Sequence, residues 1–357
     1  MSDIPQVERL LVIRRDNIGD LVCTTPLITA LRKRFPQAWL GALVNSYNAP
    51  VLERNPDLDE VIAYRKLKHL EPGESTAAAL GKRIASTWRL RRMRLDCVIL
   101  ATPDFVARTA RLARWLGPKK VLGFSDGSDA AGRLDLSVPL SKVSGRHEVE
   151  RVFALGGHLG ITGDIPPLRV IADLTEVAKT SAAFGAHRGL KVAVHISARR
   201  PMQRWPADRF AALIERLHVE HGAASMLLWS PGPADHLQHP GDDDKAAEIA
   251  AKVAGKMPLV SYRTDRLREL IGALAAADIV VCSDGGALHL AAGLRKPIVC
   301  LFGDSPPERW GPWGVPHRLV LAPSRNVLST SVDQVFGAFA DLLRSPREPA
   351  GLSSCAV

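Results

Sequence analysis

Short apolar runs alternate with longer amphipathic segments along most of this chain, and this alternation limits the folds that it can form. The run LLVIRR at residues 10–15 has the length and composition of a buried strand. The next segment, TPLITALRKRF, predicts a helix with its apolar side chains on one face: Leu27, Ala30, Leu31 and Phe35. Buried strands are again predicted at WLGALVN and CVILA, with the helix ARTARLARWL and the strand KKVLGF after them. This β-α-β-α order predicts an α/β fold with a parallel sheet covered on both faces.

The same pattern restarts in the second half of the chain. It weakens through residues 125–173, which are rich in Gly, Ser and Pro, although HEVERVFALGGHLG within them looks helical. GLKVAVHIS then begins a second series, in which the strands SMLLWS, DIVVCS and PIVCLFG alternate with helices such as DRFAALIERLHVEHG and KAAEIAAKV. The length of 357 residues is sufficient for two domains. We therefore predict domains at 1–175 and 176–345, followed by a disordered tail at 346–357.

The charge balance indicates an anionic partner. Lys and Arg number 47 against 37 Asp and Glu, which gives a net charge of +10. This surplus fits a phosphorylated ligand, an anionic membrane surface, nucleic acid or simply a basic soluble protein. Because aromatic residues make up only 5% of the chain and no recognition motif is present, we expect no nucleic-acid partner.

Cysteine usage and hydropathy bear on the compartment. The five cysteines are odd in number and none forms a CxxC pair, which argues against a zinc site or a disulfide framework and fits a reducing cytoplasm. The first residues, MSDIPQVERLLVIRR, lack the pattern of a signal peptide. No apolar stretch reaches the ~20 residues that a membrane-spanning helix needs. We expect a cytoplasmic protein that contacts a membrane only at its surface.

The stretch CSDGGALH, residues 282–289, follows the predicted strand DIVVCS, and ligands of an open parallel sheet bind beyond such strand ends. Gly285 and Gly286 permit close backbone approach or a positive φ. The helix that starts there directs amide N–H groups and its positive dipole end outward, which suits phosphate. Asp284 would then accept hydrogen bonds from sugar hydroxyls, and His289 would donate to a phosphate oxygen. The alternative is an ordinary capped helix with His289 packed inside.

The stretch RRDNIGDLVCTTP, residues 14–26, repeats this arrangement in the first half. A strand ends, a polar turn containing Gly19 follows, and a helix begins near Thr24. Asp20 lies in the turn at the same edge of its sheet, where a carboxylate can act as a general base toward a hydroxyl nucleophile. The alternative makes Asp20 or Asp16 a helix cap.

Taken together, these stretches resemble glycosyltransferase family 9, the heptosyltransferases of bacterial lipopolysaccharide core assembly. The matching pieces occur in the family's order from Arg14 to Gly314: RRDNIGDLVCTTPLITALRKRFPQA, NPDLDEVIAY, RWPADRFAALIERL and DIVVCSDGGALHLAAGLRKPIVCLFGDSPPERWGPWG. The first and the last are specific, and the two between them are weaker. The resemblance implies the GT-B architecture, in which two Rossmann-like domains with parallel sheets face a central cleft. The N-terminal domain would bind the acceptor and the C-terminal domain the nucleotide sugar.

The resemblance also implies a role for each matching residue. Asp20, in the family's GD turn, is implied as the general base, and Asp284 as a donor-sugar ligand. Gly285, Gly286 and His289 would hold the diphosphate. The acceptor would be contacted by Gly19 and Thr24. Apart from the resemblance, Arg108 lies on the carboxyl side of the predicted strand CVILA and is a weaker candidate for the acceptor phosphate.

One motif departs from the family pattern. The family usually carries Lys-Arg-Trp-Pro where this chain has Gln203-Arg204-Trp205-Pro206, so a glutamine replaces the lysine that helps to bind the donor. The missing charge would come from Arg199, Arg200 or Arg204, and the sequence does not choose among them. Further donor contacts are expected from Ser197 near the phosphates and from Thr264, in a loop SYRTD at 261–265, near the base.

The implied reaction is an inverting transfer of heptose from ADP-heptose to a lipopolysaccharide core or related saccharide, without a cofactor or a metal. The run GDDDK resembles a metal-binding DxD motif, but its position favours the solvated first turn of a helix. One alternative keeps the GT-B transferase and changes the NDP-sugar or uses a protein acceptor. Another is a catalytically silent sugar-nucleotide-binding protein, toward which only Gln203 points.

A basic segment, GKRIASTWRLRRMRLD at 81–96, predicts a helix with Ile84 and Trp88 on one side. An anionic lipid surface would attract such a helix. The family's acceptor is a phosphorylated lipid-linked saccharide, so we expect peripheral contact with the anionic inner-membrane surface. The alternative is a solvated helix that leads into the next strand.

Overall fold

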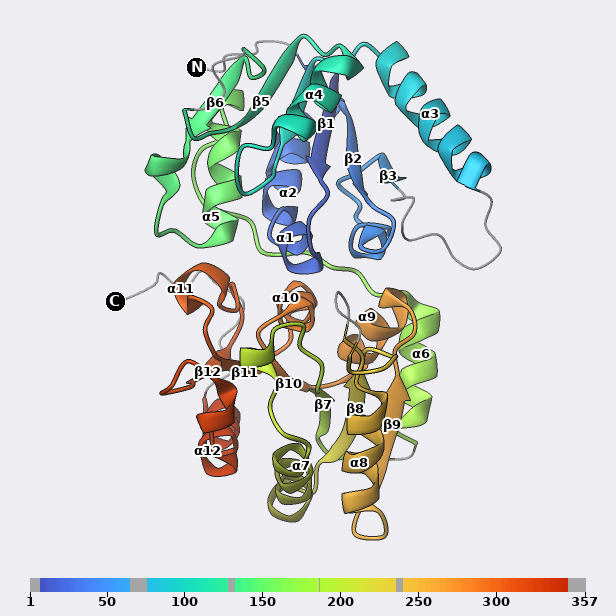
Figure 1. Cartoon of the computed structure of the whole chain (residues 1–357), viewed down its shortest axis with the longest axis vertical. Helices are drawn as coiled ribbons and strands as arrows, with labels where there is room; N and C mark the ends of the chain where they lie inside the picture. The colour runs from blue at the N-terminus through green and yellow to red at the C-terminus, as the bar shows by residue number, and fades with distance from the viewer. Residues whose placement is uncertain (1–6, 65–75, 128–131, 186, 236–239, 346–357) are drawn as a thin grey trace. The chain divides into compact units, whose positions relative to one another are not determined.

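The computed structural model describes residues 7–64, 76–127, 132–185, 187–235 and 240–345. The chain divides into two compact units, Met1–Arg169 and Val170–Val357 (Figure 1). The division lies before the predicted boundary at 175/176, because helix α6 (Leu174–Ala183) packs against α9 (Leu267–Ala276) of the second unit. The tail predicted at 346–357 lies outside the described residues.

The first unit contains a six-stranded sheet with the order β3-β2-β1-β4-β5-β6, and each neighbouring pair of strands is parallel. Its strands are β1 (Arg9–Arg14), β2 (Trp39–Asn45), β3 (Glu60–Tyr64), β4 (Cys97–Leu100), β5 (Lys120–Ser125) and β6 (Leu136–Pro139). Its α-helices are α1 (Ile18–Val22), α2 (Thr25–Arg34), α3 (Thr76–Arg92), α4 (Ala107–Leu116) and α5 (Glu148–Phe153).

Alternate side chains of β1 serve opposite faces of this sheet. Leu11 and Ile13 join a buried cluster with side chains of α3 and α4, such as Leu90 and Leu116. The predicted apolar face of α2 is buried, with Leu27 and Leu31 at 0% exposure. Both faces of the sheet are therefore covered, as the continuous apolar runs of β1, β2 and β4 predict.

The second unit contains a six-stranded parallel sheet with the order β12-β11-β10-β7-β8-β9. Its strands are β7 (Lys191–His195), β8 (Ala224–Trp229), β9 (Leu259–Arg263), β10 (Ile279–Ser283), β11 (Ile298–Phe302) and β12 (His317–Leu321). Besides α6 and α9, its α-helices are α7 (Ala207–His221), α8 (Asp243–Val253), α10 (Gly286–Gly293), α11 (Pro307–Trp310) and α12 (Val332–Arg344).

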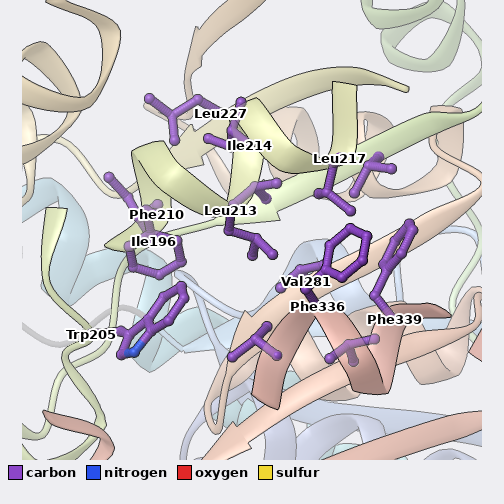
Figure 2. Packing of buried hydrophobic residues seen from close by; sticks show 14 of the residues in the cluster. Ile196, Trp205, Phe210, Leu213, Ile214, Leu217, Leu227, Val281, Phe336 and Phe339 are labelled. Carbon is purple, nitrogen blue, oxygen red and sulfur yellow. The ribbon is translucent and has the colours of Figure 1, made fainter. Parts of the chain in front are cut away.

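An apolar cluster between this sheet and helices α7, α8 and α12 forms much of the second core (Figure 2). Trp205 is 1% exposed in it and meets Phe210 edge to face, with ring centroids 4.9 Å apart. The indole Nε1 of Trp205 donates a hydrogen bond to the Thr330 carbonyl oxygen at 3.0 Å. A buried tryptophan usually needs such a partner, so this contact fixes the loop before α12.

The two sheets share one topology. Counted from the first strand of each unit, both have the order 3-2-1-4-5-6, which is the order of the Rossmann fold. In this order the chain reverses its direction of travel between the first and the fourth strand. Ligands of such sheets bind beyond the carboxyl ends of those two strands. The candidate sites are therefore the ends of β1 and β4 in the first unit and of β7 and β10 in the second.

Candidate active site

The turn after β1 is held by a helix cap. Asn17 is the N-cap of α1, and Asp20 is the third residue of the helix. The Asp20 carboxylate Oδ2 accepts hydrogen bonds from the Asn17 backbone N–H at 3.1 Å and from its Nδ2 at 2.9 Å. Asp20 is thus the capping-box acid of α1, and the local sequence fixes its orientation.

The environment of Asp20 favours the ionised form of its carboxyl group. The residue is only 5% exposed, and its Oδ1 accepts a hydrogen bond from Arg14 Nη2 at 2.7 Å. Burial raises the pKa of Asp20, but the Arg14 charge and the Asn17 hydrogen bonds outweigh burial, so the pKa lies below its ordinary value. Asp20 is therefore a carboxylate at neutral pH, and both of its oxygens are engaged.

Arg14 is a fully buried charge at the carboxyl end of β1. Its Nη2 also donates to Glu148 Oε1 at 2.9 Å, its Nε lies 3.1 Å from Asp16 Oδ2, and its Nη1 donates to the Ala101 carbonyl oxygen that follows β4. Arg14 therefore connects the two strand ends at the switch point. A buried guanidinium requires such partners, because an unpaired charge in the core costs several kcal/mol.

Asp16 differs from Asp20 in exposure and in the direction of its pKa shift. Its side chain is 27% exposed. Burial raises the pKa of Asp16 above its ordinary value, although the Arg14 charge opposes this. Its backbone carbonyl oxygen accepts hydrogen bonds from Asn45 Nδ2 at 3.3 Å and Asn48 Nδ2 at 3.2 Å, so the β1–α1 turn is anchored to the end of β2 and to the segment after it.

Of the predicted acceptor contacts, Gly19 and Thr24 are buried in α1 and its C-terminal turn. Thr24 is 0% exposed, and its Oγ1 donates to the Asp20 carbonyl oxygen at 2.9 Å. In this arrangement the Thr24 hydroxyl stabilises the helix that carries Asp20, and its predicted contact with an acceptor stays a prediction.

Arg108, in the first turn of α4, is exposed and lies beside Arg15. Arg15 stacks on the ring of Tyr64, with its guanidinium carbon 4.7 Å from the centroid, and Arg83 stacks there at 4.4 Å. Burial lowers the pKa of Arg15, and the positive charges of Arg108 and Arg83 lower it further. Three guanidinium groups thus gather near the carboxyl end of β1, where they suit an anionic ligand.

In the second unit, Asp284 and Gly285 follow the end of β10, and Gly286 begins α10. Gly285 has an extended backbone, with φ 160°, and neither glycine lies in the left-handed region, so of the two predicted uses of these glycines only close approach remains. A Cβ built on Gly285 would meet nothing closer than the Ser283 carbonyl oxygen at 4.0 Å, which leaves room for close approach. Burial raises the pKa of Asp284, against the Ser305 hydrogen bond and the Arg200 charge.

His289 lies one turn into α10 and is 3% exposed. Its ring packs edge to face against Trp310, with centroids 6.0 Å apart. This burial agrees with the alternative of a packed histidine, and the predicted contact with a phosphate stays a prediction.

The side chain of Gln203 is hydrogen-bonded to the turn after β11. Its side chain is buried, its Oε1 accepts from the Gly303 N–H at 2.9 Å, and its Nε2 donates to Ser305 Oγ at 3.1 Å. Arg200 Nη1 donates to the same Ser305 Oγ at 3.1 Å, and its Nη2 pairs with Asp304 Oδ2 at 2.5 Å. Gln203 and Arg200 together hold the turn after β11 beside Asp284.

Arg204 and Ser197 lie at the end of β7 beside the start of α8. Arg204 Nη2 pairs with Asp242, the N-cap of α8, and its Nη1 donates to the Ala198 carbonyl oxygen at 3.1 Å. Ser197 Oγ accepts from the Ser230 N–H at 2.9 Å. The helix turn predicted for GDDDK is confirmed, but the expectation that it is solvated is wrong for Asp242, which is 1% exposed because it is paired.

The same strand end holds two titratable groups that the sequence analysis did not single out. Lys245 Nζ donates to the Ile196 carbonyl oxygen at 3.0 Å, and burial lowers the pKa of Lys245 to about 8. Burial and the Lys245 charge lower the pKa of His195 to about 4. Within the described part of the chain, neither ring nitrogen of His195 has a hydrogen-bond partner. Both groups were detectable in the sequence only as polar residues beside apolar runs.

The prediction that SYRTD, residues 261–265, forms a loop is wrong for its first three residues. Residues 261–263 form the end of strand β9, because they pair in parallel with β8. Thr264 follows the strand and is 7% exposed, and its Oγ1 donates to the Trp229 carbonyl oxygen at 2.6 Å. Its backbone N–H donates to the same oxygen at 3.2 Å. Its predicted contact with a nucleotide base stays a prediction.

The model of glycosyltransferase family 9 (heptosyltransferase) matches residues 83–334, more than half of the chain. The chain belongs to glycosyltransferase family 9. The match includes the predicted donor-site residues of the second unit, whereas Gly19, Asp20 and Thr24 lie before its start.

Relatives of known identity agree with this membership. Lipopolysaccharide heptosyltransferase 2 of Escherichia coli K12 is 26% identical over 314 residues, which are 84% of each chain. The glycosyltransferase family 9 structure from Veillonella parvula has a TM-score of 0.78 at 20% identity and covers 96% of this chain and 99% of its own. The E. coli heptosyltransferase WaaC with ADP-2-deoxy-2-fluoro heptose has a TM-score of 0.71 at 20% identity, with coverages of 93% and 99%. The two Rossmann-like sheets are thus the GT-B fold of this family.

Proposed function

We propose that this family 9 enzyme transfers heptose from ADP-heptose to a lipopolysaccharide core or related saccharide, with inversion at the anomeric carbon. The observation that carries the proposal is the family match over both the α10 turn and the strand ends around it. The heptosyltransferase relative and the complex of another relative with an ADP-heptose analogue support the donor. In this proposal the second unit binds the donor and the first unit the acceptor.

Asp20 would act as the general base. Its carboxylate takes the proton of the acceptor hydroxyl, the oxygen forms a bond to the anomeric carbon, and the bond to the diphosphate breaks with its electron pair on the departing oxygen. The ionised state of Asp20 supports this role, since a base must be unprotonated at the working pH. Proton transfer then requires Asp20 to release a hydrogen bond from Asn17.

The diphosphate would bind at the N-terminus of α10 beside Gly285, Gly286 and His289, where helix amides stabilise the charge that develops on departure. Asp284 would bind the sugar hydroxyls. Arg200, Arg204 and Lys245 are the candidates for the charge that Gln203 lacks, because all three lie near the ends of β7 and β11. Metal independence and the absence of a cofactor are parts of the proposal.

The first experiment is a calorimetric titration of the full chain with ADP, UDP, GDP and dTDP in EDTA. Preference for ADP supports the proposed donor and metal-free binding, and a rate assay with ADP-heptose and a lipopolysaccharide-core acceptor follows. Preference for another nucleotide would replace the sugar donor within the same family. Binding without turnover on any acceptor would favour the silent binding protein.

The same assay tests Asp20. Asp20→Asn should reduce kcat by about 10²–10⁴-fold, the usual contribution of a general base, while nucleotide affinity stays the same. Asp135→Asn is a control in the same unit, since Asp135 is also a carboxylate paired with an arginine, Arg114 at 2.8 Å, although its side chain is more exposed than that of Asp20. Unchanged turnover of Asp20→Asn would remove Asp20 from the mechanism.

The proposal includes peripheral contact with an anionic inner-membrane surface on the cytoplasmic side. Helix α3 exposes Ile84 and Trp88 by 50% and 49%, and Trp88 meets the half-exposed Trp115 edge to face. Arg91 stacks on the Trp115 ring at 5.3 Å, so basic and aromatic groups share this surface. No helix of the described segments is both long enough and apolar enough to cross a membrane.

Vesicle flotation tests this contact. Vesicles that contain phosphatidylglycerol should bind the chain, and salt should weaken the binding. Ile84→Ser with Trp88→Ser should release the chain, whereas Val219→Ser, at a residue 73% exposed on α7, should not. Equal flotation of all variants would assign the contact to another surface.

A further inference from the structure

Arg14 is surrounded by three carboxyl groups. Asp16, Asp20 and Glu148 all face its guanidinium, and Arg151 lies near Glu148, with Nε 3.4 Å from Oε2. Three carboxylates therefore surround the one guanidinium of Arg14, with Arg151 beside Glu148 and Arg15 acting on Asp16. This cluster joins β1, the turn after it, α1 and α5.

One nitrogen of Arg14 serves two carboxylates. Nη2 donates to Asp20 Oδ1 at 2.7 Å and to Glu148 Oε1 at 2.9 Å. The charge of Arg14 is thus shared between them. An isolated Arg14–Asp20 pair would hold Asp20 more firmly in the ionised form and make it a weaker base, because a nearby opposite charge stabilises a carboxylate. Glu148 opposes that effect.

We propose that Glu148 is a positioning residue that keeps Asp20 basic by taking part of the charge and the hydrogen-bonding capacity of Arg14. The inference rests on the proposed role of Asp20 as the base. Glu148 is 0% exposed, so it acts through Arg14 and not by contact with a substrate.

The fold does not need the charge of Glu148 to start helix α5. The capping box of this helix is formed by His147 and Glu150, and the Glu150 Oε2 accepts from the His147 N–H at 3.0 Å. Arg151 is held separately, because its Nη2 donates to the Pro103 carbonyl oxygen at 2.9 Å. A glutamine at 148 would keep the shape of the side chain and an oxygen that can accept from Arg14.

The charged and titratable groups that face Asp20 come from each neighbouring element. Arg14 lies on β1, Asp16 on the turn, Glu148 on α5, and the buried thiol of Cys23 at the end of α1. Of these, the Glu148→Gln change removes one negative charge and leaves the others in place. Arg14 keeps Asp16 and Asp20 as charged partners in this variant, so the variant should fold.

The experiment measures kcat for ADP-heptose and a lipopolysaccharide-core acceptor across pH. Glu148→Gln should lower kcat roughly three- to tenfold, since proton transfer follows the basicity of the acceptor group. The acidic limb of the kcat profile should move to lower pH. Nucleotide affinity and the thermal midpoint should stay close to those of the unaltered chain. Glu148→Asp keeps the charge and should recover part of the rate.

Glu269→Gln is the matched control, because Glu269 is also buried and pairs at three-residue spacing with Arg266 at 2.7 Å. Its kcat should not change. In an Asp20→Asn background, Glu148→Gln should have no further effect on the residual rate.

If Asp20→Asn is inactive and Glu148→Gln retains full kcat and the same acidic limb, the inference is overturned and the proposed function stands. A loss of rate that merely follows a lowered thermal midpoint, in Glu148→Asp as well as Glu148→Gln, would show a structural role and also overturn it. Absence of turnover by the unaltered chain would overturn the proposed function and this inference together.

Discussion

Lys245 should make the stability of the second unit depend on pH in the alkaline range. Burial lowers its pKa from 10.5 to about 8. One pKa unit corresponds to about 1.4 kcal/mol, so the charged ammonium destabilises the folded chain by roughly 3 kcal/mol at pH 7. Between pH 8 and 10.5 the unfolded chain binds the extra proton, so the free energy of unfolding should rise with pH across that window.

Lys245→Met removes the titrating ammonium, so a comparison with the unaltered chain shows how much of the pH dependence comes from Lys245. The free energy of unfolding of the variant, relative to the unaltered chain, should be higher at pH 7 than at pH 10.5 by roughly 3 kcal/mol. Urea unfolding at the two pH values gives the difference, in which the titration of other groups cancels. Lys252→Met on the same helix is the control, because Lys252 is 45% exposed beside Glu248 and should show no such difference.

An equal effect of Lys245→Met at both pH values would refute this reasoning. It would mean that the Ile196 carbonyl oxygen and Asp242 stabilise the Lys245 ammonium in the folded chain as much as water does in the unfolded chain. The Lys245 ammonium would then not destabilise the folded chain, and its burial would not need a role in anion binding as its reason.

Three further substitutions test the donor site and the first unit. Asp284→Asn should weaken binding of ADP-heptose at least tenfold by calorimetry, since about 1.4 kcal/mol is one decade, while ADP, which lacks the sugar, binds as before; it should also raise the thermal midpoint, because burial disfavours the charge of Asp284. Gln203→Ala should lower the free energy of unfolding by about 1–3 kcal/mol through the unpaired Gly303 N–H, whereas Met202→Ala, 42% exposed, should stay within about 0.5 kcal/mol in urea. Asp96 accepts from two backbone N–H groups and Lys119, and these hydrogen bonds hold its pKa below the ordinary value against burial. Asp96→Asn should therefore destabilise at pH 7, and the loss should shrink as pH falls through that lowered pKa.

The central strands were predictable and the edge strands were not. Strands β1, β2, β4, β5, β7, β8, β10 and β11 were predicted from their apolar runs, which arise because helices cover both of their faces. The strands that the pattern missed, β3, β6, β9 and β12, are the edges of the two sheets. An edge strand is partly solvated and often carries charged residues, as LVSYR in β9 does, so its apolar pattern is weak.

In the candidate sites, too, some features were predictable from the sequence and others were not. The places of Asp20 and Asp284 were predictable, because a strand end followed by a glycine turn and a helix is a local pattern. The contact between Arg14 and Glu148 was not predictable, because Glu148 lies 134 residues away and only the fold brings it near. One indication of this contact was present in the sequence, the arginine Arg14 within the apolar run LLVIRR. A buried arginine requires a counter-ion, but the sequence does not show which carboxylate supplies it.

The distance along the chain between Arg14 and Glu148 also sets an order of events during synthesis. At about 5–20 residues per second, Glu148 leaves the ribosome roughly 7–27 s after Arg14. Arg169, whose Nη1 pairs with Asp57 Oδ2 at 2.8 Å, follows later still. Until then the central strand β1 ends in a guanidinium whose α5 partner does not yet exist, so a nascent chain cannot bury it at the same free energy. The first unit should therefore reach its final packing only near the end of its own translation, and chaperones that hold nascent chains have this interval in which to act.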